Sequence, residues 1–481
     1  MATPELLVPL ATPMQQENPD QNSTISIQPQ SQEPEELDEC AHPNPESVND
    51  VKYAQYGWFE VPPSLFKYSN ARSLVLDANN LSELSSGFNA FNQLEILSVR
   101  NNLLRNILPD SISWSSLHTL DLSHNQLHDL PRELSRCSRL RFLNLSDNKL
   151  ANIPNGVYSL RSLEVLNLNQ NHISQLGDQV SNWRLLASLS IEKNALENIP
   201  KALTKLISLR ALRLSFNKML SLPVGFDGLV NLSVLCLDHN FFKFIPAQIY
   251  ELWNLTELDL SFNNGIDFLP IDIARLTQLR VLGLNGNSIP DLPEEIAYLH
   301  DLQYLGVEGN PIESLPDRLF HLVALQELRL SRCALAEVPE EVCSLRELET
   351  LALQGNPLTT LPPDMCTLTS LTTLILNDCR FNELPFSLCV LRGLEVLMLA
   401  GNALSALPNE IRALESLQQL DLSHNRFAVF PEVRQELETL RALDLSLNSI
   451  AQLPADFFLR LRNLCLLNLK GNQFESIPEE L

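Results

Sequence analysis

Basic residues are scarce in this 481-residue sequence: 34 lysines and arginines stand against 58 aspartates and glutamates, a formal net charge of −24. Nucleic acids and anionic membranes attract basic surfaces, so this balance argues against both as main partners. The sequence also lacks any run of about 18 apolar residues, the length that a membrane-spanning helix needs. We expect no nucleic-acid partner and no membrane insertion.

Signals for secretion are missing too. Residues 1–15 contain no basic segment, and Pro9 and Pro13 interrupt their short apolar run, so they do not resemble a signal peptide. The nine cysteines are odd in number and scattered rather than clustered for disulfides. These absences predict a reducing compartment, the cytoplasm or the nucleus.

Motifs for common cofactors and catalytic centres are likewise absent. The sequence contains no GxxxxGK(S/T) loop, no GxGxxG after a strand pattern and no HExxH. We therefore predict no cofactor, no bound metal and no enzymatic activity.

What the sequence has in abundance is one pattern repeated every 23 residues. It reads LxxLxLxxNxL followed by LP, and it is clear at Leu117–Leu127 and Leu130-Pro131. Its ninth position is filled by Asn79, Asn102, Asn125, Asn148, Asn171, Asn194, Asn217, Asn240, Asn263, Asn287, Asn310, Cys333, Asn356, Cys379, Asn402, Asn425, Asn448 and Asn472. Two intervals are one residue longer, around Asn264-Gly265 and within 455–464. A fixed period of this length predicts a leucine-rich repeat solenoid of about 18 repeats.

This pattern predicts an α/β solenoid, the leucine-rich repeat horseshoe, with parallel strands on the concave face and short helical, 3-10 or extended arcs on the convex face. Leucines at the first, fourth and sixth positions point inward, and stacking of neighbouring repeats buries them in one continuous core. The ninth-position asparagines satisfy buried backbone groups where the chain leaves each strand. This structural role is assigned to Asn125, Asn148, Asn171, Asn217 and Asn240.

Composition divides the chain into three parts. Residues 1–46 are rich in Pro, Gln, Glu, Asn and Ser, which predicts a disordered acidic tail. Residues 47–71 are expected to form an N-terminal cap for a solenoid that spans residues 72–481. The cap carries the densest aromatic cluster of the chain, Tyr53, Tyr56, Trp58 and Phe59. Because Leu481 falls in the middle of a repeat, the last repeat is expected to associate end to end with another copy, or else the gene product is truncated.

Side chains at the fifth, seventh and eighth positions are expected to point outward from the concave face, where equivalent residues of neighbouring repeats form ladders. Two regions of these ladders differ from the polar background. The first comprises Arg213, Phe216, His239 and Phe262. The second comprises Ile375 and Met398 with Ala352, Ala400, Gly355 and Gly401, and Arg329 is a further candidate. Aromatic, Arg and Met residues are enriched in protein interfaces, so these positions are predicted to bind a partner. The alternative is sequence drift on a tolerant surface.

A cysteine nucleophile is one chemical interpretation of this surface. Cys236, His239 and Asp259 supply the residue types of a triad. They fall, however, on ladder positions that every repeat offers, and such positions imply no pocket. A cysteine hydrolase is therefore a remote alternative.

Two further sets of residues have the composition of metal ligands. His118, His124 and His128 lie within one repeat but alternate between faces. Cys343, Cys366 and Cys389 occupy the same position in consecutive repeats, which places them in a line rather than around a tetrahedral zinc ion. Neither set predicts a metal site.

The arc pattern also carries a family resemblance. With segments such as Leu292-Pro-Glu-Glu-Ile296 and Leu361-Pro-Pro-Asp-Met365, residues 58–481 resemble the Ras-group intracellular leucine-rich repeat proteins, which include the Ras–Raf scaffold and the Ras-suppressor protein. The resemblance implies a protein, not an enzyme, that binds a Ras-family GTPase, a kinase or a phosphatase catalytic subunit on its concave face. Residues 30–50 are acidic where the Ras–Raf scaffold is basic, and the tail has no (R/K)VxF docking motif. Only framework residues match, so no functional residue is transferred.

Two hypotheses follow for the function. The first is a non-enzymatic scaffold or adaptor in intracellular signalling. The second is a regulatory or targeting subunit of a single enzyme, such as a protein phosphatase.

Overall fold

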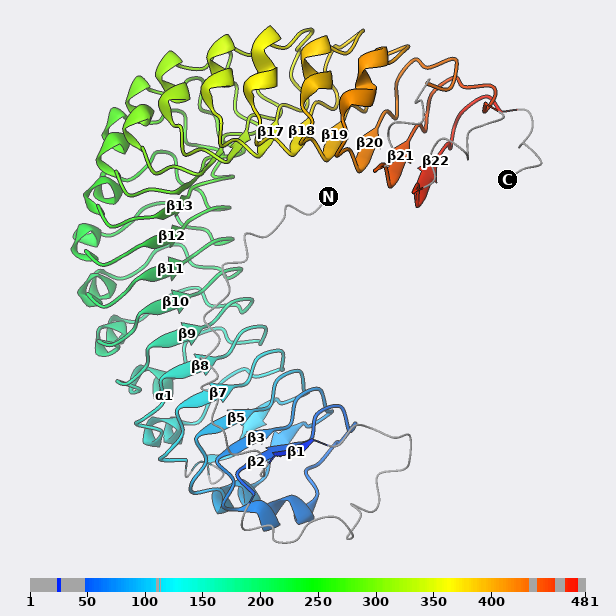
Figure 1. Ribbon diagram of the computed structural model, residues 1–481. Helices are drawn as coiled ribbons and strands as arrows, with labels where there is room; N and C mark the ends of the chain where they lie inside the picture. The colour runs from blue at the N-terminus through cyan, green and yellow to red at the C-terminus, as the bar shows by residue number, and fades with distance from the viewer. Residues whose placement is uncertain are drawn as a thin grey trace. The chain divides into compact units, whose positions relative to one another are not determined.

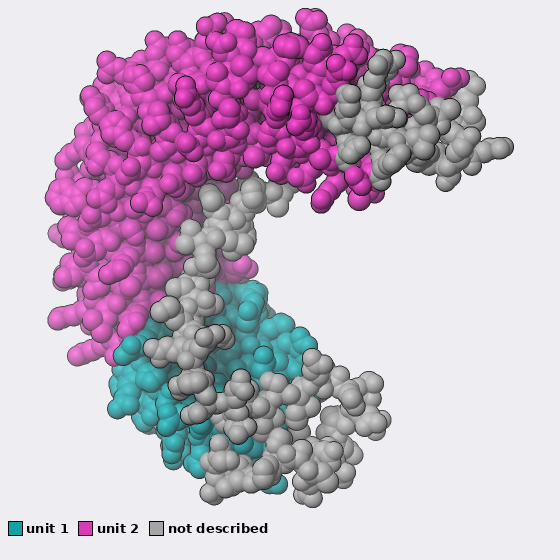
Figure 2. Space-filling model, viewed as in Figure 1, with its two compact units in different colours: residues 1–149, 154–160 teal, residues 150–153, 161–481 magenta. Residues whose placement is uncertain are grey.

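The computed structural model describes residues 24–26, 48–109, 112, 114–431, 439–454 and 463–474. The chain forms two compact units, residues 1–149 with 154–160 (unit 1) and residues 150–153 with 161–481 (unit 2), shown in different colours in Figure 2. Of the predicted tail, only Thr24–Ser26 lies within the described residues, and these three form a strand. Leu481, on which the predicted self-association depends, lies outside them.

Unit 1 contains one parallel sheet and a small second one. The strands of the first, in spatial order, are β1 (Thr24–Ser26), β2 (Asp50–Lys52), β3 (Ser73–Val75), β5 (Ile96–Ser98), β7 (Thr119–Asp121) and β8 (Phe142–Asn144). The second pairs β4 (Glu83–Leu84) with β6 (Asn106–Ile107). The arcs between strands contain the 3-10 helices η2 (Pro63–Tyr68), η3 (Ser86–Ala90) and η5 (Arg132–Arg136) and the short helix α1 (Asn155–Tyr158).

The predicted cap region lies at the first coil of unit 1. Tyr53 and Trp58 are buried, with ring centroids 5.1 Å apart, and Tyr56 lies edge-on to Tyr53 at 5.5 Å. The backbone amide of Tyr56 donates to Asn79 Oδ1, so the aromatic segment is bonded to the first repeat's asparagine. Phe59, by contrast, is exposed.

Unit 2 contains a longer parallel sheet, with one strand for each repeat (Figure 1). Its strands are β9 (Val165–Asn167), β10 (Ser188–Ser190), β11 (Ala211–Arg213), β12 (Val234–Cys236), β13 (Glu257–Asp259), β14 (Val281–Gly283), β15 (Tyr304–Gly306), β16 (Glu327–Arg329), β17 (Thr350–Ala352), β18 (Thr373–Ile375), β19 (Val396–Met398), β20 (Gln419–Asp421), β21 (Ala442–Asp444) and β22 (Leu466–Asn468). Each strand pairs in parallel with the next, and equivalent positions face each other, as Leu212 faces Leu235.

The arcs of unit 2 contain 3-10 helices in the repeats up to Ala413. They are η6 (Asp178–Asn182), η7 (Lys201–Lys205), η8 (Phe226–Gly228), η9 (Ala247–Glu251), η10 (Ile271–Arg275), η11 (Glu294–Tyr298), η12 (Asp317–His321), η13 (Glu340–Ser344), η14 (Pro363–Thr367), η15 (Phe386–Val390) and η16 (Asn409–Ala413). Most follow a proline, such as Pro246 before η9, whose φ of −60° suits the start of a helical turn. Its carbonyl accepts from the amide of Ile249 at 3.0 Å. Parallel strands joined by such arcs confirm the predicted leucine-rich repeat solenoid.

Buried leucines and asparagines hold neighbouring repeats together in both units. The inward leucines, such as Leu235 and Leu237, have no exposed surface. Asn240 Oδ1 accepts from the amide of Met219, while Nδ2 donates to the carbonyls of Leu214 and Leu237 at 3.0 Å. Each asparagine of this kind bonds backbone groups of two successive repeats, and those groups lie where no strand can pair them.

Candidate functional site

The eighth position of every repeat adopts the left-handed backbone conformation, with φ between 52° and 74°. These residues are Ala78, Asn101, His124, Asp147, Gln170, Lys193, Phe216, His239, Phe262, Gly286, Gly309, Arg332, Gly355, Asp378, Gly401, His424, Leu447 and Gly471. The conformation turns the chain out of the strand just before the buried asparagine. Gly, Asn, Asp and His tolerate it well, whereas a bulky residue there is uncommon. Phe216 and Phe262 therefore occupy positions that disfavour phenylalanine.

Phe216, His239 and Phe262 form a stacked column of three rings, which we call the aromatic column. The centroids of Phe216 and His239 are 3.9 Å apart with 14° between the planes, and those of His239 and Phe262 are 4.5 Å apart with 30°. Lys193 Nζ lies 5.6 Å from the Phe216 centroid. Both phenylalanines remain about two-fifths exposed, at 43% and 40%. The stack thus presents apolar surface to solvent in consecutive repeats.

A glycine follows the aromatic column in the next repeat. A Cβ placed on Gly286 would lie 2.3 Å from Phe262 Cδ1, closer than any real contact. The Phe262 ring therefore occupies space that a side chain at position 286 would need.

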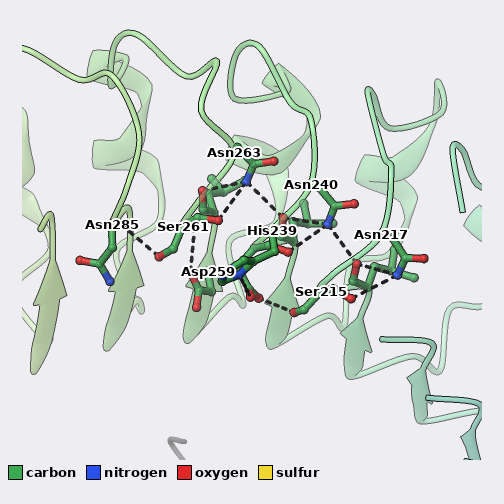
Figure 3. A network of polar contacts seen from close by, with 12 residues as sticks. Ser215, Asn217, His239, Asn240, Asp259, Ser261, Asn263 and Asn285 are labelled. Carbon is green, nitrogen blue, oxygen red and sulfur yellow. Dashed lines mark hydrogen bonds and ion pairs between the residues drawn. The ribbon is translucent and has the colours of Figure 1, made fainter. Parts of the chain in front are cut away.

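Carboxylates and hydroxyls lie close to His239, the middle ring of the column (Figure 3). His239 Nδ1 lies 2.9 Å from Asp238 Oδ2, and Ser215 Oγ donates to Asp238 Oδ1. In the next repeat, the amide of Ser261 donates to Asp259 Oδ1 at 2.9 Å. Asp238 is only 14% exposed in its side chain, so these bonds fix the His239 ring between the two phenylalanines.

Burial and the nearby Asp238 raise the pKa of Asp259 above the ordinary range of a carboxyl group. The folded protein therefore binds this proton more readily than the unfolded chain does. Ionised Asp259 destabilises the fold at pH values above its raised pKa, and this penalty disappears below the ordinary pKa of aspartate.

Asp259→Asn is accordingly expected to raise the free energy of unfolding by about 1 kcal/mol near neutral pH, with the gain vanishing towards about pH 4. An amide oxygen can still accept from Ser261. Denaturant unfolding at several pH values measures the effect. The matched control is Asp121→Asn. Asp121 accepts from Ser123 and from Asn144, so this substitution should lower the free energy of unfolding. A pH-independent gain at Asp259 would contradict the explanation.

The other predicted binding residues are less accessible than the aromatic column. Arg213 is half-buried at the end of β11. Arg329 Nε donates to Glu327 Oε1, so its charge is already paired. Ile375 and Met398 face each other in register but are half-buried, and the neighbouring Ala352 is 1% exposed. The second region is therefore a weaker apolar surface than its sequence indicates.

Cys236 is in an unfavourable environment for a nucleophile. Its side chain is buried, and burial together with the nearby Glu257 raises the pKa of the thiol well above its ordinary value. Cys236 Sγ lies 3.7 Å from Glu257 Oε1, whereas His239 Nδ1 bonds Asp238. A reactive cysteine needs a lowered pKa and a paired base, and this geometry offers neither.

The histidines and cysteines with the composition of metal ligands do not gather into a site. Within the part of the chain that the structure describes, no group of three His, Cys, Asp or Glu residues could hold a metal ion. His124 Nδ1 lies 2.6 Å from Asp147 Oδ2. Burial raises the pKa of Cys343 to about 11 and that of Cys389 to about 12.

Among the described residues, no helix has the length and apolar character that a membrane span requires.

Comparison with known proteins identifies the architecture. Family profiles described as "Leucine-rich repeat region", "Leucine rich repeat" and "Leucine Rich repeats (2 copies)" match residues 337–443, residues 92–150 and 253–312, and residues 138–182, respectively. An LRR protein of Leptospira interrogans is 30% identical with a TM-score of 0.69, and the alignment covers 79% of this chain and 91% of that one. The chain belongs to the leucine-rich repeat family.

Other leucine-rich repeat structures are similar at lower identity. The LRR ectodomain of the plant membrane receptor kinase GASSHO1/SCHENGEN3 from Arabidopsis thaliana, solved in complex with CASPARIAN STRIP INTEGRITY FACTOR 2, is 25% identical with a TM-score of 0.61. That alignment covers 90% of this chain and 56% of the ectodomain. The Arabidopsis receptor kinase HAESA is 23% identical with a TM-score of 0.58, covering 90% of this chain and 83% of that one. No curated protein matches the chain in sequence.

Proposed function

We propose that this leucine-rich repeat chain is a protein-interaction scaffold or adaptor without enzymatic activity, and that it binds its partner through the aromatic column of unit 2. The observation that carries the proposal is the exposed stack of Phe216, His239 and Phe262 on left-handed backbone.

The stack lowers the stability of the free protein. Holding a phenylalanine in the left-handed region costs on the order of 1–3 kcal/mol. The repeat does not require it, since Asn, Asp, Gln and Gly occupy the same position elsewhere. Stacking two ring pairs offsets part of that cost, about 0.5–1.5 kcal/mol for each pair. Burying the rings against a partner adds the hydrophobic gain that the free surface lacks.

The resemblance to the Ras-group proteins suggests the class of partner. We propose a Ras-family GTPase, a kinase or a phosphatase catalytic subunit in the cytoplasm or nucleus. Support for a macromolecular partner comes from the plant LRR ectodomain that is 25% identical and was solved in complex with CASPARIAN STRIP INTEGRITY FACTOR 2. The same surface would serve a regulatory subunit of a single enzyme, and the number of partners separates the two roles.

Affinity purification with quantitative mass spectrometry, followed by binding of each recovered protein in purified form, tests the proposal. Phe216→Ser with Phe262→Ser is expected to weaken binding of the main partner at least tenfold, or about 1.4 kcal/mol, without lowering the melting temperature. Phe386→Ser is the matched control, because Phe386 is 61% exposed on η15. If a Ras-type GTPase is recovered, its GDP and GTP forms are compared. Undiminished binding by the double variant removes the aromatic column from the interface.

A further inference from the structure

A groove of about 880 Å³ lies on the arc side of unit 2, between the segments that contain η9 and η10. Phe244 and Phe268 occupy equivalent positions of successive repeats, are 56% and 52% exposed, and line it together with Ile271, which is 62% exposed. The buried Tyr250 also lines it. The groove is separate from the aromatic column, because none of the three residues of the column lines it.

The extra residue of one repeat distinguishes this place in the solenoid. Pro246 follows Asn240 by six positions, but Pro270 follows Asn263 by seven, because Asn264-Gly265 lengthen the turn. Gly265 packs closely on the preceding repeat: a Cβ there would lie 2.9 Å from the carbonyl oxygen of Phe242. The two arcs that border the groove therefore differ in the length of their connection to the strand.

Tyr250, one of the residues that line this groove, has an unpaired hydroxyl. The residue is 4% exposed, and its Oη is the one buried side-chain oxygen or nitrogen without a hydrogen-bond partner among the residues that the structure describes. Leaving a buried hydroxyl unbonded costs about 1–3 kcal/mol. Burial and the nearby Asp272 raise the pKa of Tyr250, so the hydroxyl keeps its proton and can donate it to an acceptor.

The charges around the groove favour a basic occupant. Arg275 and Glu251 neutralise each other through two contacts of 2.7 Å. The other charged residues that line the groove are Asp267, Asp272 and Lys243, which leaves one carboxylate in excess. An acidic occupant would be repelled by this excess and by the net charge of −24 on the whole chain.

We propose that this groove is a second recognition site, which binds a segment of a partner protein that places an apolar side chain beside lysine or arginine. The apolar side chain lies between Phe244 and Phe268, a carbonyl of the segment accepts from Tyr250 Oη, and the basic residue pairs with Asp267 or Asp272. Because Oη itself has almost no exposed area, the occupant displaces a neighbouring side chain to reach it. The site goes beyond the proposed function, which concerns the aromatic column.

Fluorescence anisotropy with the full chain and three short labelled peptides tests this proposal. The first peptide alternates Arg or Lys with Leu and Phe, the second has Glu in place of every basic residue, and the third has Ser in place of every apolar one. Only the first is expected to bind. Tyr250→Phe and Phe268→Ser, each made separately, are expected to weaken its binding about tenfold, equivalent to about 1.4 kcal/mol.

Two controls separate this result from misfolding and from failure of the proposal that the aromatic column binds a partner. Tyr250→Phe removes only an unpaired hydroxyl, so the melting temperature should stay the same or rise. Phe386→Ser, and Phe216→Ser with Phe262→Ser, should leave peptide binding unchanged. The proposal is overturned if the first peptide does not bind, if the acidic peptide binds equally well, or if neither groove substitution weakens binding.

Discussion

Asn240→Ala is expected to lower the free energy of unfolding of unit 2 by about 2–4 kcal/mol, a large share of the stability of a typical domain. The Asn240 side chain is the hydrogen-bond acceptor of the buried Met219 amide, at 2.9 Å. Alanine would leave that amide without a partner in the interior, where an orphaned donor costs about 1–3 kcal/mol. The carbonyls of Leu214 and Leu237 each keep a second donor, from Asn217 and Asn263, so their loss is smaller. Urea denaturation followed by circular dichroism measures the change.

Asn240→Cys is the control for this prediction, because the protein itself places cysteine in the same position twice. Cys333 Sγ lies 3.5 Å from the carbonyl oxygen of Val307, and in the preceding repeat the amide of Ile312 donates instead to the Asn310 carbonyl at 2.9 Å. The backbone can thus rearrange around a thiol that still donates. Cysteine should therefore cost less than alanine at position 240. Equal losses for the two substitutions would show that the side-chain hydrogen bonds are not the source of the stability.

The period of the sequence was enough to predict the solenoid, since stacked repeats bury leucines and asparagines that recur at fixed intervals. It also placed Phe216, His239 and Phe262 at equivalent positions of successive repeats, which predicts that their side chains are neighbours. It did not reveal that the eighth position is left-handed in every repeat. The sequence carried a signal for this, because Gly, His and Asp recur there. Phe216 and Phe262 depart from this preference in the repeats that form the aromatic column.

Other features depend on side-chain packing that a period does not encode. Ile375, Met398 and Arg213 belong to one ladder that was expected to point outward, and all three are half-buried. The unpaired hydroxyl of Tyr250 and the groove lined by Phe244 and Phe268 lie beside the longer repeat. The position of the insertion was visible in the sequence, but its consequence for the arcs was not.

Gly286→Ala is expected to disrupt the aromatic column and to weaken partner binding about as much as removing Phe262. The added Cβ would meet Phe262 Cδ1 at 2.3 Å, and a φ of 61° adds strain for any residue other than glycine. The Phe262 ring must move, because the backbone is held by the buried Asn287. Ring-current shifts of the His239 imidazole protons in NMR spectra, together with partner affinity, measure the loss of stacking.

Gly309→Ala separates the strain of the backbone from the collision of the ring. Gly309 has a similar φ of 68°, but a Cβ there meets nothing closer than 3.7 Å, in the backbone of Gly286. Both variants should lose about 1 kcal/mol of stability from the left-handed conformation, whereas only Gly286→Ala should shift the His239 signals and reduce binding. In a Phe262→Ala background the extra loss caused by Gly286→Ala should disappear, since the two residues then no longer compete for space. Persistence of that loss would mean that Gly286 acts on binding by a route other than the ring of Phe262.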